Sequence, residues 1–290
     1  MTEASEKDEK GEHDTVSESA FGAGGVLLRR HPAEGTGVVA EIVLNRAEAM
    51  NAISTAMAGA IRDVVPGLAD DAAVRAVVVS SAPPSAEGKN HAFCVGVDLK
   101  ERNKMSDAEL IATRPAFRRS WAAFGALPMP VIAAVSGYAL GGGCELALGC
   151  DLIVADDGAV FGLPEVSVGV IPGGGGTQTL ARRVGMNRAA DLIFTARRID
   201  ADEADRFGMI DRRVAGTSTA RAAALELARQ IARNSPIGVR NAKHALRVGA
   251  DLPLAAGLDV EDGAWLATAL AADRAEGVRA FVEKRRPVWP

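Results

Sequence analysis

Cysteine is scarce in this chain of 290 residues: only Cys94, Cys144 and Cys150 occur, and no two of them have CxxC spacing. The four histidines also lack the spacing typical of metal ligands. A chain of this size buries roughly three quarters of its unfolded surface, so folding needs neither a disulfide nor a structural metal. We therefore expect no disulfide framework and no metal site.

The sequence also lacks an excess of positive charge and a long apolar run. It has 33 Lys and Arg against 37 Asp and Glu, a net charge of −4. No broad positive field is therefore available to hold a nucleic acid or an anionic membrane surface. The longest apolar stretches, at 131–135 and 139–148, are well short of the roughly 20 residues that span a bilayer. We expect no nucleic-acid partner and no membrane helix.

The first twenty residues lack an apolar block and are rich in Glu, Lys, Asp and Ser. They resemble neither a secretory signal nor an Arg-rich transit peptide, which favours a cytoplasmic protein. Such a segment buries too little apolar surface to offset the entropy of ordering. The sequence therefore predicts a disordered acidic tail over residues 1–22, before the composition changes at Gly25.

From Gly25 onward, short runs rich in β-branched residues alternate with helical patterns. The runs at 38–44, 76–80, 131–135 and 152–155 are bounded by turn formers and predict strands. Helices are predicted at 55–68 and 107–127, and Pro115 should end or kink the second one. This alternation predicts an α/β core over residues 23–215, with mostly parallel strands and both sheet faces covered.

After about Ile210 the strand pattern stops. Four amphipathic helices are predicted beyond it, at 219–233, 236–248, 254–272 and 274–284. The C-terminal region, residues 216–290, is therefore expected to be helical.

Two glycine-rich segments invite a nucleotide-binding interpretation that their spacing does not support. A GxGxxG motif counted from Gly141 fails because its last position is Leu146. The segment from Gly173 to Thr177 lacks the lysine of a phosphate loop. Neither dinucleotide nor phosphate-loop chemistry is indicated.

The most informative segment leads from a predicted strand through Gly141, Gly142 and Gly143 into a helix that carries Glu145 in its first turn. A helix start presents unpaired backbone N–H groups and the positive end of the helix dipole, and glycine lets a ligand approach them closely. This pattern predicts an oxyanion site. The alternative for Glu145 is a surface carboxylate that only stabilises the helix start.

A second glutamate, Glu165, follows another predicted strand on a tight turn, where catalytic side chains are common. Glu145 and Glu165 follow consecutive strands, so they could converge on one cavity and divide the work of a proton donor and a proton acceptor. The alternative for Glu165 is a turn carboxylate in water.

An earlier segment repeats this arrangement, with Gly96 and Val97 after a strand and Asp98 at a helix N-cap position. The N–H groups of Val97 and Gly142, from separate loops, could together hold one carbonyl oxygen, as stabilisation of an enolate requires. On its own, this segment is better explained as a capped helix start.

These residues belong to motifs that resemble those of the enoyl-CoA hydratase/isomerase, or crotonase, superfamily. Six motifs occur in the family's order between about Gly25 and Pro290, namely IVLNRAEAMNAI at 42–53, AFCVGVDLK at 92–100, GYALGGGCELA at 137–147, FGLPE at 161–165, IPGGGGTQ at 171–178 and EGVRAFVEKR at 276–285. The resemblance implies a crotonase-like spiral of ββα turns and a C-terminal trimerisation region at 216–290. It also implies homotrimers or hexamers built as dimers of trimers.

The resemblance further implies an acyl-CoA thioester as the substrate, with coenzyme A as part of that substrate and no separate cofactor. The oxyanion amides map to Val97 and Gly142, and the two acids map to Glu145 and Glu165. The implied coenzyme A contacts are Ala49, Val97, Asp98, Leu99, Lys100, Gly142, Phe281 and Lys284, of which Phe281 and Lys284 would serve a neighbouring subunit's site. Lys100 and Lys284 are equally well explained as solvated surface charges.

Retention of both acids favours an enoyl-CoA hydratase, because family members with other chemistry often lack one of them. The alternatives are a double-bond isomerase, a dehydratase of hydroxyacyl- or carnitinyl-CoA, and a hydratase of aromatic enoyl-CoA. A non-catalytic acyl-CoA-binding or scaffolding protein is a further alternative. The motifs do not define the acyl chain.

Overall fold

The structure is a computed structural model that describes residues 16–23, 25–33, 35, 37–83, 91–216 and 218–289. Most of the predicted acidic tail, residues 1–15, lies outside the described residues. The prediction is wrong for its last part, because Ser17–Phe21 forms strand β1, which pairs antiparallel with β2 (Val26–Pro32). Four of its five side chains are exposed, so backbone pairing at a sheet edge holds this strand, which the composition does not reveal.

The larger sheet has seven strands in the order β1-β2-β3-β4-β6-β8-β11. Pairing is antiparallel from β1 to β3 and parallel from β3 to β11, as predicted for the core. The remaining strands are β3 (Val38–Leu44), β4 (Val74–Ser81), β6 (Val131–Val135), β8 (Leu152–Asp156) and β11 (Arg212–Val214). The four predicted strands are confirmed. The short β11 corrects the expectation that strands stop at about residue 210, since three residues are too few to show a period.

The smaller sheet has the order β10-β9-β7-β5. Its strands are β5 (Ala92–Cys94), β7 (Tyr138–Leu140), β9 (Val160–Gly162) and β10 (Arg198–Asp200). Strands β5, β7 and β9 are parallel neighbours, whereas β10 is antiparallel to β9. The carboxyl ends of β5, β7 and β9 therefore meet at one edge of this sheet.

Side chains of the larger sheet alternate between two apolar cores. In β4, Val77 and Val79 belong to the main core, which also includes residues of helices α1 (Thr55–Asp70), α3 (Asp107–Ala126) and α4 (Gly142–Gly149). Ala76 and Val78 face α8 (Ala220–Ala232) on the other side. Both faces are thus covered, as predicted. Helix α3 begins with a capping box at Ser106 and runs through Pro115 without ending there.

Shorter helices connect these elements and complete a crotonase-like spiral. They are the 3-10 turns η1 (Ala47–Ala49) and η2 (Pro164–Val168) and the helices α2 (Leu99–Arg102), α5 (Gly176–Val184), α6 (Met186–Thr195) and α7 (Ala201–Arg206). No helix in the described ranges is both long enough and apolar enough to span a bilayer.

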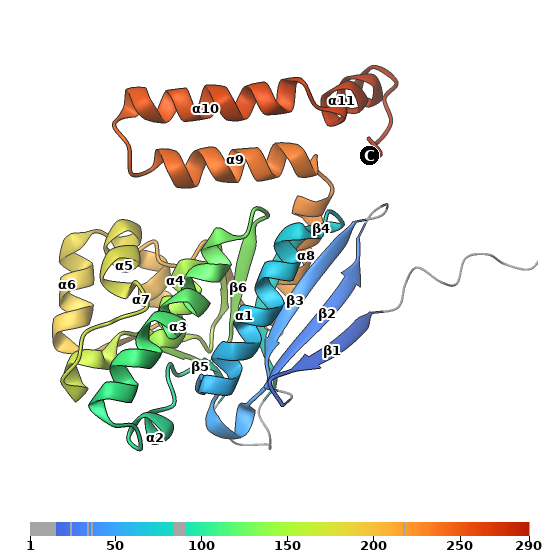
Figure 1. Cartoon of the computed structure of the whole chain (residues 1–290). Helices are drawn as coiled ribbons and strands as arrows, with labels where there is room; N and C mark the ends of the chain where they lie inside the picture. The colour runs from blue at the N-terminus through green and yellow to red at the C-terminus, as the bar shows by residue number, and fades with distance from the viewer. Residues whose placement is uncertain are drawn as a thin grey trace, which may run out of the picture.

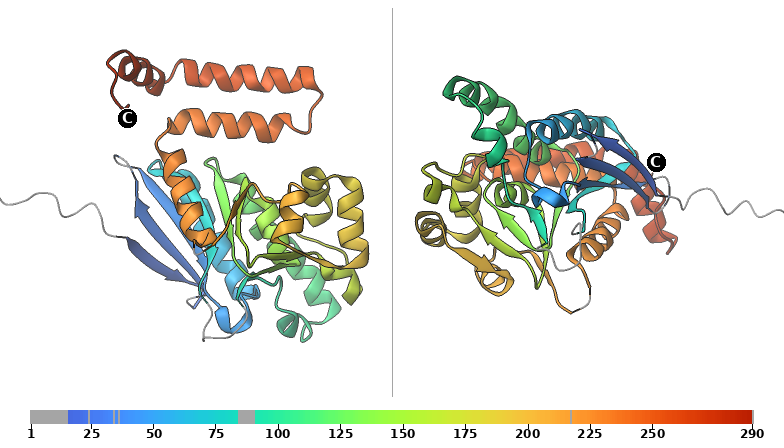
Figure 2. Two further views of the ribbon diagram at one scale, coloured as in Figure 1. Left: turned by 180° about the vertical axis from the view of Figure 1, so that it is seen from behind. Right: turned by 90° about the horizontal axis from the view of Figure 1, so that it is seen from below.

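The last three helices, α9 (Pro236–Gly249), α10 (Leu254–Ala269) and α11 (Ala272–Val282), form a layer that we call the arm; the rest of the chain is the body. Figures 1 and 2 show the arm stacked above the body, with α10 beyond α9. The C-terminal region is helical, as predicted. However, α8 packs on the sheet, so the structural division falls between α8 and α9 rather than at residue 216.

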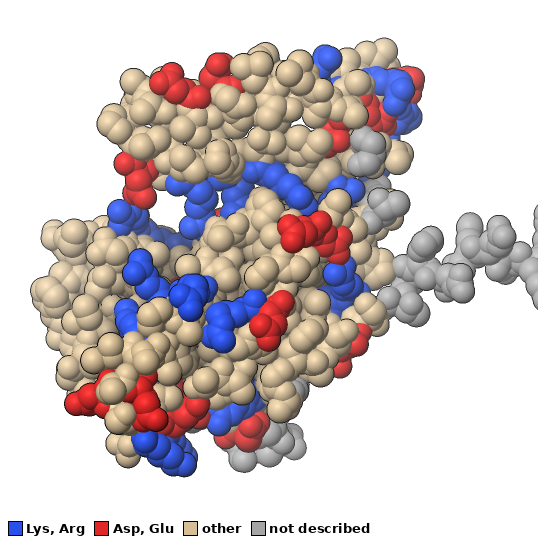
Figure 3. All heavy atoms as spheres, viewed as in Figure 1, with Lys and Arg blue, Asp and Glu red and all other residues tan. Residues whose placement is uncertain are grey.

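Cationic side chains attach the arm to the body. Lys243, only 8% exposed, donates to Met129 O at 2.8 Å and forms an ion pair with Asp151 at 2.6 Å. Arg247 binds the other oxygen of Asp151 at 2.7 Å. Arg240 donates to the backbone oxygens of Asp71 and Val74. Figure 3 shows Lys and Arg side chains gathered where the arm meets the body.

Candidate active site

Three loops meet at the carboxyl ends of β5, β7 and β9. The first turns at Gly96, the second at Gly141 before α4, and the third leads into η2 and Glu165. Gly96 and Gly141 have φ angles of +92° and +52°, a region that side-chain-bearing residues rarely adopt. The topology therefore brings together the three segments in which the sequence predicted chemistry.

Glycine allows the first two loops to touch. A β-carbon on Gly96 would lie 2.9 Å from Gly142 N, and one on Gly143 would lie 2.0 Å from Cys94 O. This contact places the Gly96–Val97 peptide next to the start of α4. Neither the Val97 N–H nor the Gly142 N–H has a protein acceptor in the part of the chain that the structure describes. Two backbone donors from separate loops are thus available side by side.

Glu145 lies in the first turn of α4 and is 5% exposed. Its Oε1 accepts hydrogen bonds from the backbone N–H groups of Gly174 at 2.6 Å and Gly176 at 2.8 Å. Burial raises the pKa of this carboxyl, while the backbone hydrogen bonds oppose the rise. Glu145 is therefore an oriented, desolvated carboxyl rather than the surface charge of the alternative interpretation.

Glu165 lies on η2 and is half-buried. Its Oε1 is 3.2 Å from the position a β-carbon on Gly141 would take, whereas its buried Oε2 has no hydrogen-bond partner among the described residues. Burial, and then the negative charge of Glu145, raise the pKa of Glu165 to about 7. The two glutamates are thus gathered around the start of α4, and Glu165 is not a solvated turn carboxylate.

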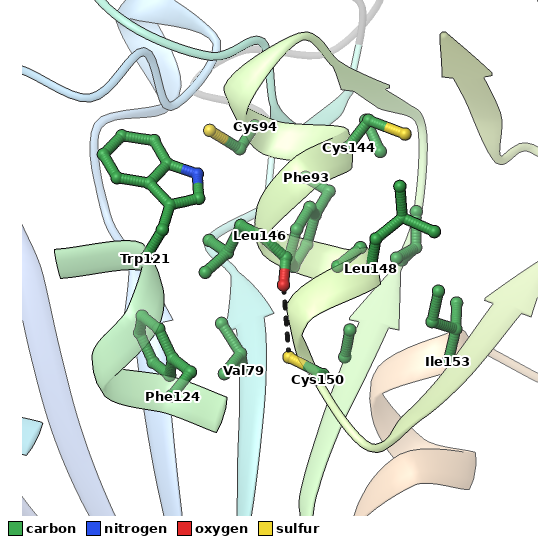
Figure 4. Close-up of a cluster of buried hydrophobic side chains, with 14 of the residues drawn as sticks. Val79, Phe93, Cys94, Trp121, Phe124, Cys144, Leu146, Leu148, Cys150 and Ile153 are labelled. Carbon is green, nitrogen blue, oxygen red and sulfur yellow. Dashed lines mark hydrogen bonds between the residues drawn. The ribbon is translucent and has the colours of Figure 1, made fainter. Parts of the chain in front are cut away.

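The sequence interpretation missed several groups that build this site. The backbone N–H groups of Gly174 and Gly176 bind Glu145. In the sequence, only the run of glycines at 173–176 marks these two residues. Trp121, 7% exposed, donates from Nε1 to Gly142 O at 2.6 Å and so anchors the peptide that directly follows the predicted oxyanion N–H of Gly142. Figure 4 shows its indole nitrogen directed toward the ribbon of α4. Nothing in the local sequence pattern marks a helical tryptophan for this contact.

The residues predicted to hold coenzyme A on the body lie beside one another. Met50 O, next to Ala49, accepts a hydrogen bond from Val95 N at 3.3 Å, and Ile53 forms a parallel bridge with Val97. Leu99 and Lys100 are exposed on α2.

Asp98 has a structural role. It caps α2 through the N–H groups of Lys100 and Glu101, and its pKa is lowered chiefly by its hydrogen bond with Arg46, whose ion pair with Asp98 is 2.7 Å long. The predicted N-cap is therefore confirmed.

Phe281 and Lys284 do not reach this site within one chain. Phe281 lies on α11 and Lys284 just beyond it, and both are exposed. In Figure 1, α11 and α2 lie at opposite ends of the molecule. Their predicted role at a neighbouring subunit's site stays a prediction.

The cysteines belong to the apolar core beneath the site. All three are buried and free, and Figure 4 shows Cys150 near the carbonyl of Leu146, which accepts from its Sγ at 3.4 Å. Burial raises the pKa of Cys94 and of Cys150 to about 12, so these thiols stay protonated near neutral pH. In the described ranges, no three His, Cys, Asp or Glu side chains are placed to share a metal ion.

Comparison with known proteins agrees with this geometry. The family model of enoyl-CoA hydratase/isomerase matches residues 34–290. YngF of Bacillus subtilis strain 168, assigned by name to the enoyl-CoA hydratase/isomerases, is 41% identical over 87% of this chain and 94% of its own length. Human mitochondrial methylglutaconyl-CoA hydratase is 40% identical over 90% of this chain and 76% of its own length.

The crystal structure of an enoyl-CoA hydratase from Bacillus anthracis superposes with a TM-score of 0.84 at 38% identity, covering 90% of this chain and 98% of that one. The fold and the family resemblance expected from the motifs are confirmed. The chain therefore belongs to the enoyl-CoA hydratase/isomerase, or crotonase, family.

Proposed function

We propose that this protein is an enoyl-CoA hydratase, which reversibly adds water across the 2,3 double bond of a 2-enoyl-CoA thioester. The observation that carries the proposal is the meeting of two desolvated carboxyls, Glu145 and Glu165, at a pair of unpaired backbone N–H groups. Addition of water needs all of these parts, because one proton must leave the water and another must reach carbon.

The N–H groups of Val97 and Gly142 would hold the thioester oxygen. As water adds at Cβ, negative charge moves onto this oxygen, and fixed donors stabilise it without reorganising. Loss of one such donor typically lowers turnover roughly a hundred- to a thousandfold. The contact of Trp121 with Gly142 O supports this assignment, because it anchors the backbone immediately after the Gly142 N–H.

The two acids divide the proton transfers. Glu145, anchored through Oε1, would use its other oxygen to orient the water and take its proton. Glu165, with its pKa raised to about 7, carries a proton in a large fraction of molecules near neutral pH and would deliver it to Cα. After one turnover Glu145 has gained a proton and Glu165 has lost one. A proton must therefore pass from Glu145 to Glu165 before the next turnover.

Coenzyme A would lie along Ala49 and Val97 to Lys100, where the structure leaves Leu99 and Lys100 exposed. Phe281 and Lys284 would reach the site of a neighbouring subunit in a homotrimer, which can pair into a hexamer. The apolar surface of the arm supports this assembly: Leu254, Trp265, Leu270 and Phe281 are 63% to 84% exposed. Apolar side chains at this density are typical of an interface.

The assembly is tested by light scattering on the purified chain. We expect a mass of three or six chains, and Leu258→Glu combined with Trp265→Glu should release monomers. Because Phe281 and Lys284 would then be lost from the site, the Michaelis constant for the thioester should rise. A monomeric unmodified protein would contradict the assembly.

The reaction is tested by following the absorbance of the conjugated thioester in but-2-enoyl-CoA. We expect the absorbance to fall as water adds, and Glu145→Gln or Glu165→Gln to reduce turnover by roughly a hundred- to ten-thousandfold. Retained binding of coenzyme A thioesters would show that the variants are folded. If a 3-enoyl-CoA is shifted to the 2-enoyl isomer while but-2-enoyl-CoA is not hydrated, the protein is an isomerase instead.

A further inference from the structure

One face of helix α3 lies along the candidate active site. Arg114, Phe117 and Trp121 are spaced by three and four residues, so they share this face. Phe117 is 4% exposed, and its ring centroid is 5.9 Å from that of Trp121. Trp121 in turn binds Gly142 O. The face therefore leads from the proposed oxyanion site outward to Arg114.

Arg102, at the end of α2, packs onto the same face. Its guanidinium carbon lies 5.3 Å from the centroid of the Phe117 ring. Its Nε is buried and has no hydrogen-bond partner among the described residues, and no carboxylate pairs with its guanidinium there. A buried donor without a partner is costly, and in proteins it usually has a ligand, a water or an ion to bind.

Arg114 lies against the loop that holds Glu145. It donates from Nη2 to Gly173 O at 2.6 Å, and the next residue, Gly174, donates to Glu145. Within the described ranges Arg114 also lacks a carboxylate partner. Arg46 and Arg183 of the body, by contrast, form ion pairs of 2.7 Å.

The two guanidinium groups affect each other and the site. Burial, followed by the positive charge of Arg114, lowers the pKa of Arg102. The charge of Arg114 also lowers the pKa of Glu145 against the effect of burial. These two like charges repel each other, and in the described ranges neither forms an ion pair with a carboxylate, so a bound anion would relieve the repulsion.

We propose that Arg102 and Arg114 form a subsite for a carboxylate at the far end of the acyl group, so that the preferred substrates are coenzyme A monothioesters of dicarboxylic acids. The inference rests on the proposed acyl-CoA site. Arginine suits this role because its planar guanidinium binds carboxylates through paired, charge-assisted hydrogen bonds. Arg114 adjoins the loop of Glu145, which would face Cβ. Its guanidinium therefore assigns the pair to the acyl side of the site.

The test compares two saturated, unreactive ligands of equal carbon number, glutaryl-CoA and valeryl-CoA, by titration calorimetry. We expect the unmodified protein to bind glutaryl-CoA more tightly by roughly ten- to a hundredfold, the range for hydrogen bonds to a charged group. The ratio of the two dissociation constants should fall toward one in Arg114→Gln and in Arg102→Gln. Arg114→Lys should retain part of the preference, since it keeps a cation.

Arg119→Gln is the matched control, because Arg119 is an exposed arginine of the same helix, and it should leave the ratio unchanged. Equal affinities in the unmodified protein would overturn the proposal. Equal weakening of both ligands by Arg114→Gln would also overturn it, since the guanidinium would then serve the phosphates of coenzyme A. Failure of the proposed function is seen separately, as binding of both ligands without hydration of but-2-enoyl-CoA.

Discussion

The body and the arm use opposite kinds of contact. Strands β4 and β6 of the body and helix α4 are almost wholly buried among apolar side chains. In the arm, α9 buries only Lys243 and α10 only Ala264, whereas large apolar side chains such as Leu254 and Leu270 are exposed. The body is held by its core and the arm by ion pairs with the body.

One carboxyl from each region illustrates this difference, although the body also holds paired acids such as Asp98, whose pKa is lowered by Arg46. In the body, burial raises the pKa of Glu165 to about 7, because few groups compensate for the lost water. In the arm, hydrogen bonds from Arg285, the Val288 N–H and Arg279 lower the pKa of Glu276. A desolvated acid with a raised pKa is suited to proton transfer, whereas an acid paired with arginine is suited to holding two segments together. The two desolvated acids that fit proton transfer, Glu145 and Glu165, both belong to the body.

The largest effect is expected where the body is most tightly packed, at Gly143 of α4. A β-carbon there would lie 2.0 Å from Cys94 O, a backbone atom that cannot rotate away. Gly143→Ala should therefore lower the free energy of unfolding by more than about 3 kcal/mol, measured in urea. Gly149→Ala on the same helix is the control, since a β-carbon there meets nothing within 4 Å. Similar stabilities of the two variants would contradict this description of the body.

The next effect concerns the contact between the regions. Asp151→Asn removes the charge that pairs with Lys243 and Arg247 and leaves the largely buried Lys243 uncompensated. Breaking a buried pair costs roughly 3–5 kcal/mol. Because the Asp151 side chain is 17% exposed, we expect a smaller loss of about 2 kcal/mol in the free energy of unfolding, with faster hydrogen exchange in α9.

Arg182→Gln provides the comparison, because the ion pair of Arg182 with Asp251 is mostly exposed on both sides. It should change the free energy of unfolding by less than about 1 kcal/mol. Equal effects of Asp151→Asn and Arg182→Gln would mean that the arm does not depend on the buried cation.

The sequence predicted the parts of the body that are long or rich in glycine. Strands such as 131–135 show a clear apolar run, and glycines at 96 and 141–143 mark close backbone approach, so the site segments were located. Strands β5, β7 and β9 have only three residues each, too few to show alternation, and they depend on their neighbours for pairing. Trp121 and Arg114 were missed because their roles depend on which face of α3 the tertiary packing turns toward the site.

The pH dependence of activity sharpens the contrast between the carboxyls. If Glu165 donates a proton during hydration, kcat/KM should fall about tenfold per pH unit above pH 7, because the protonated form of the free enzyme is lost. The raised pKa also means that the folded state holds this proton more tightly than the unfolded state. The free energy of unfolding should therefore fall as the pH rises from 4.5 toward 7.

Glu165→Gln cannot lose a proton, so its residual activity should not show this decline. Profiles of kcat/KM for but-2-enoyl-CoA between pH 6 and 9 provide the measurement. A flat profile for the unmodified enzyme would show that Glu165 does not donate the proton.

A small effect of the opposite sign is expected in the arm, at Gly263 of α10. This residue is exposed, and a β-carbon there meets nothing within 4 Å of the same chain. Alanine is a better helix former than glycine by about 1 kcal/mol, so Gly263→Ala should raise the free energy of unfolding by up to this amount. A loss of stability would show instead that another chain packs against Gly263, since no contact within one chain opposes the added methyl group. The sign of this change in the free energy of unfolding therefore tells whether the side of α10 that carries Gly263 faces the proposed trimer interface.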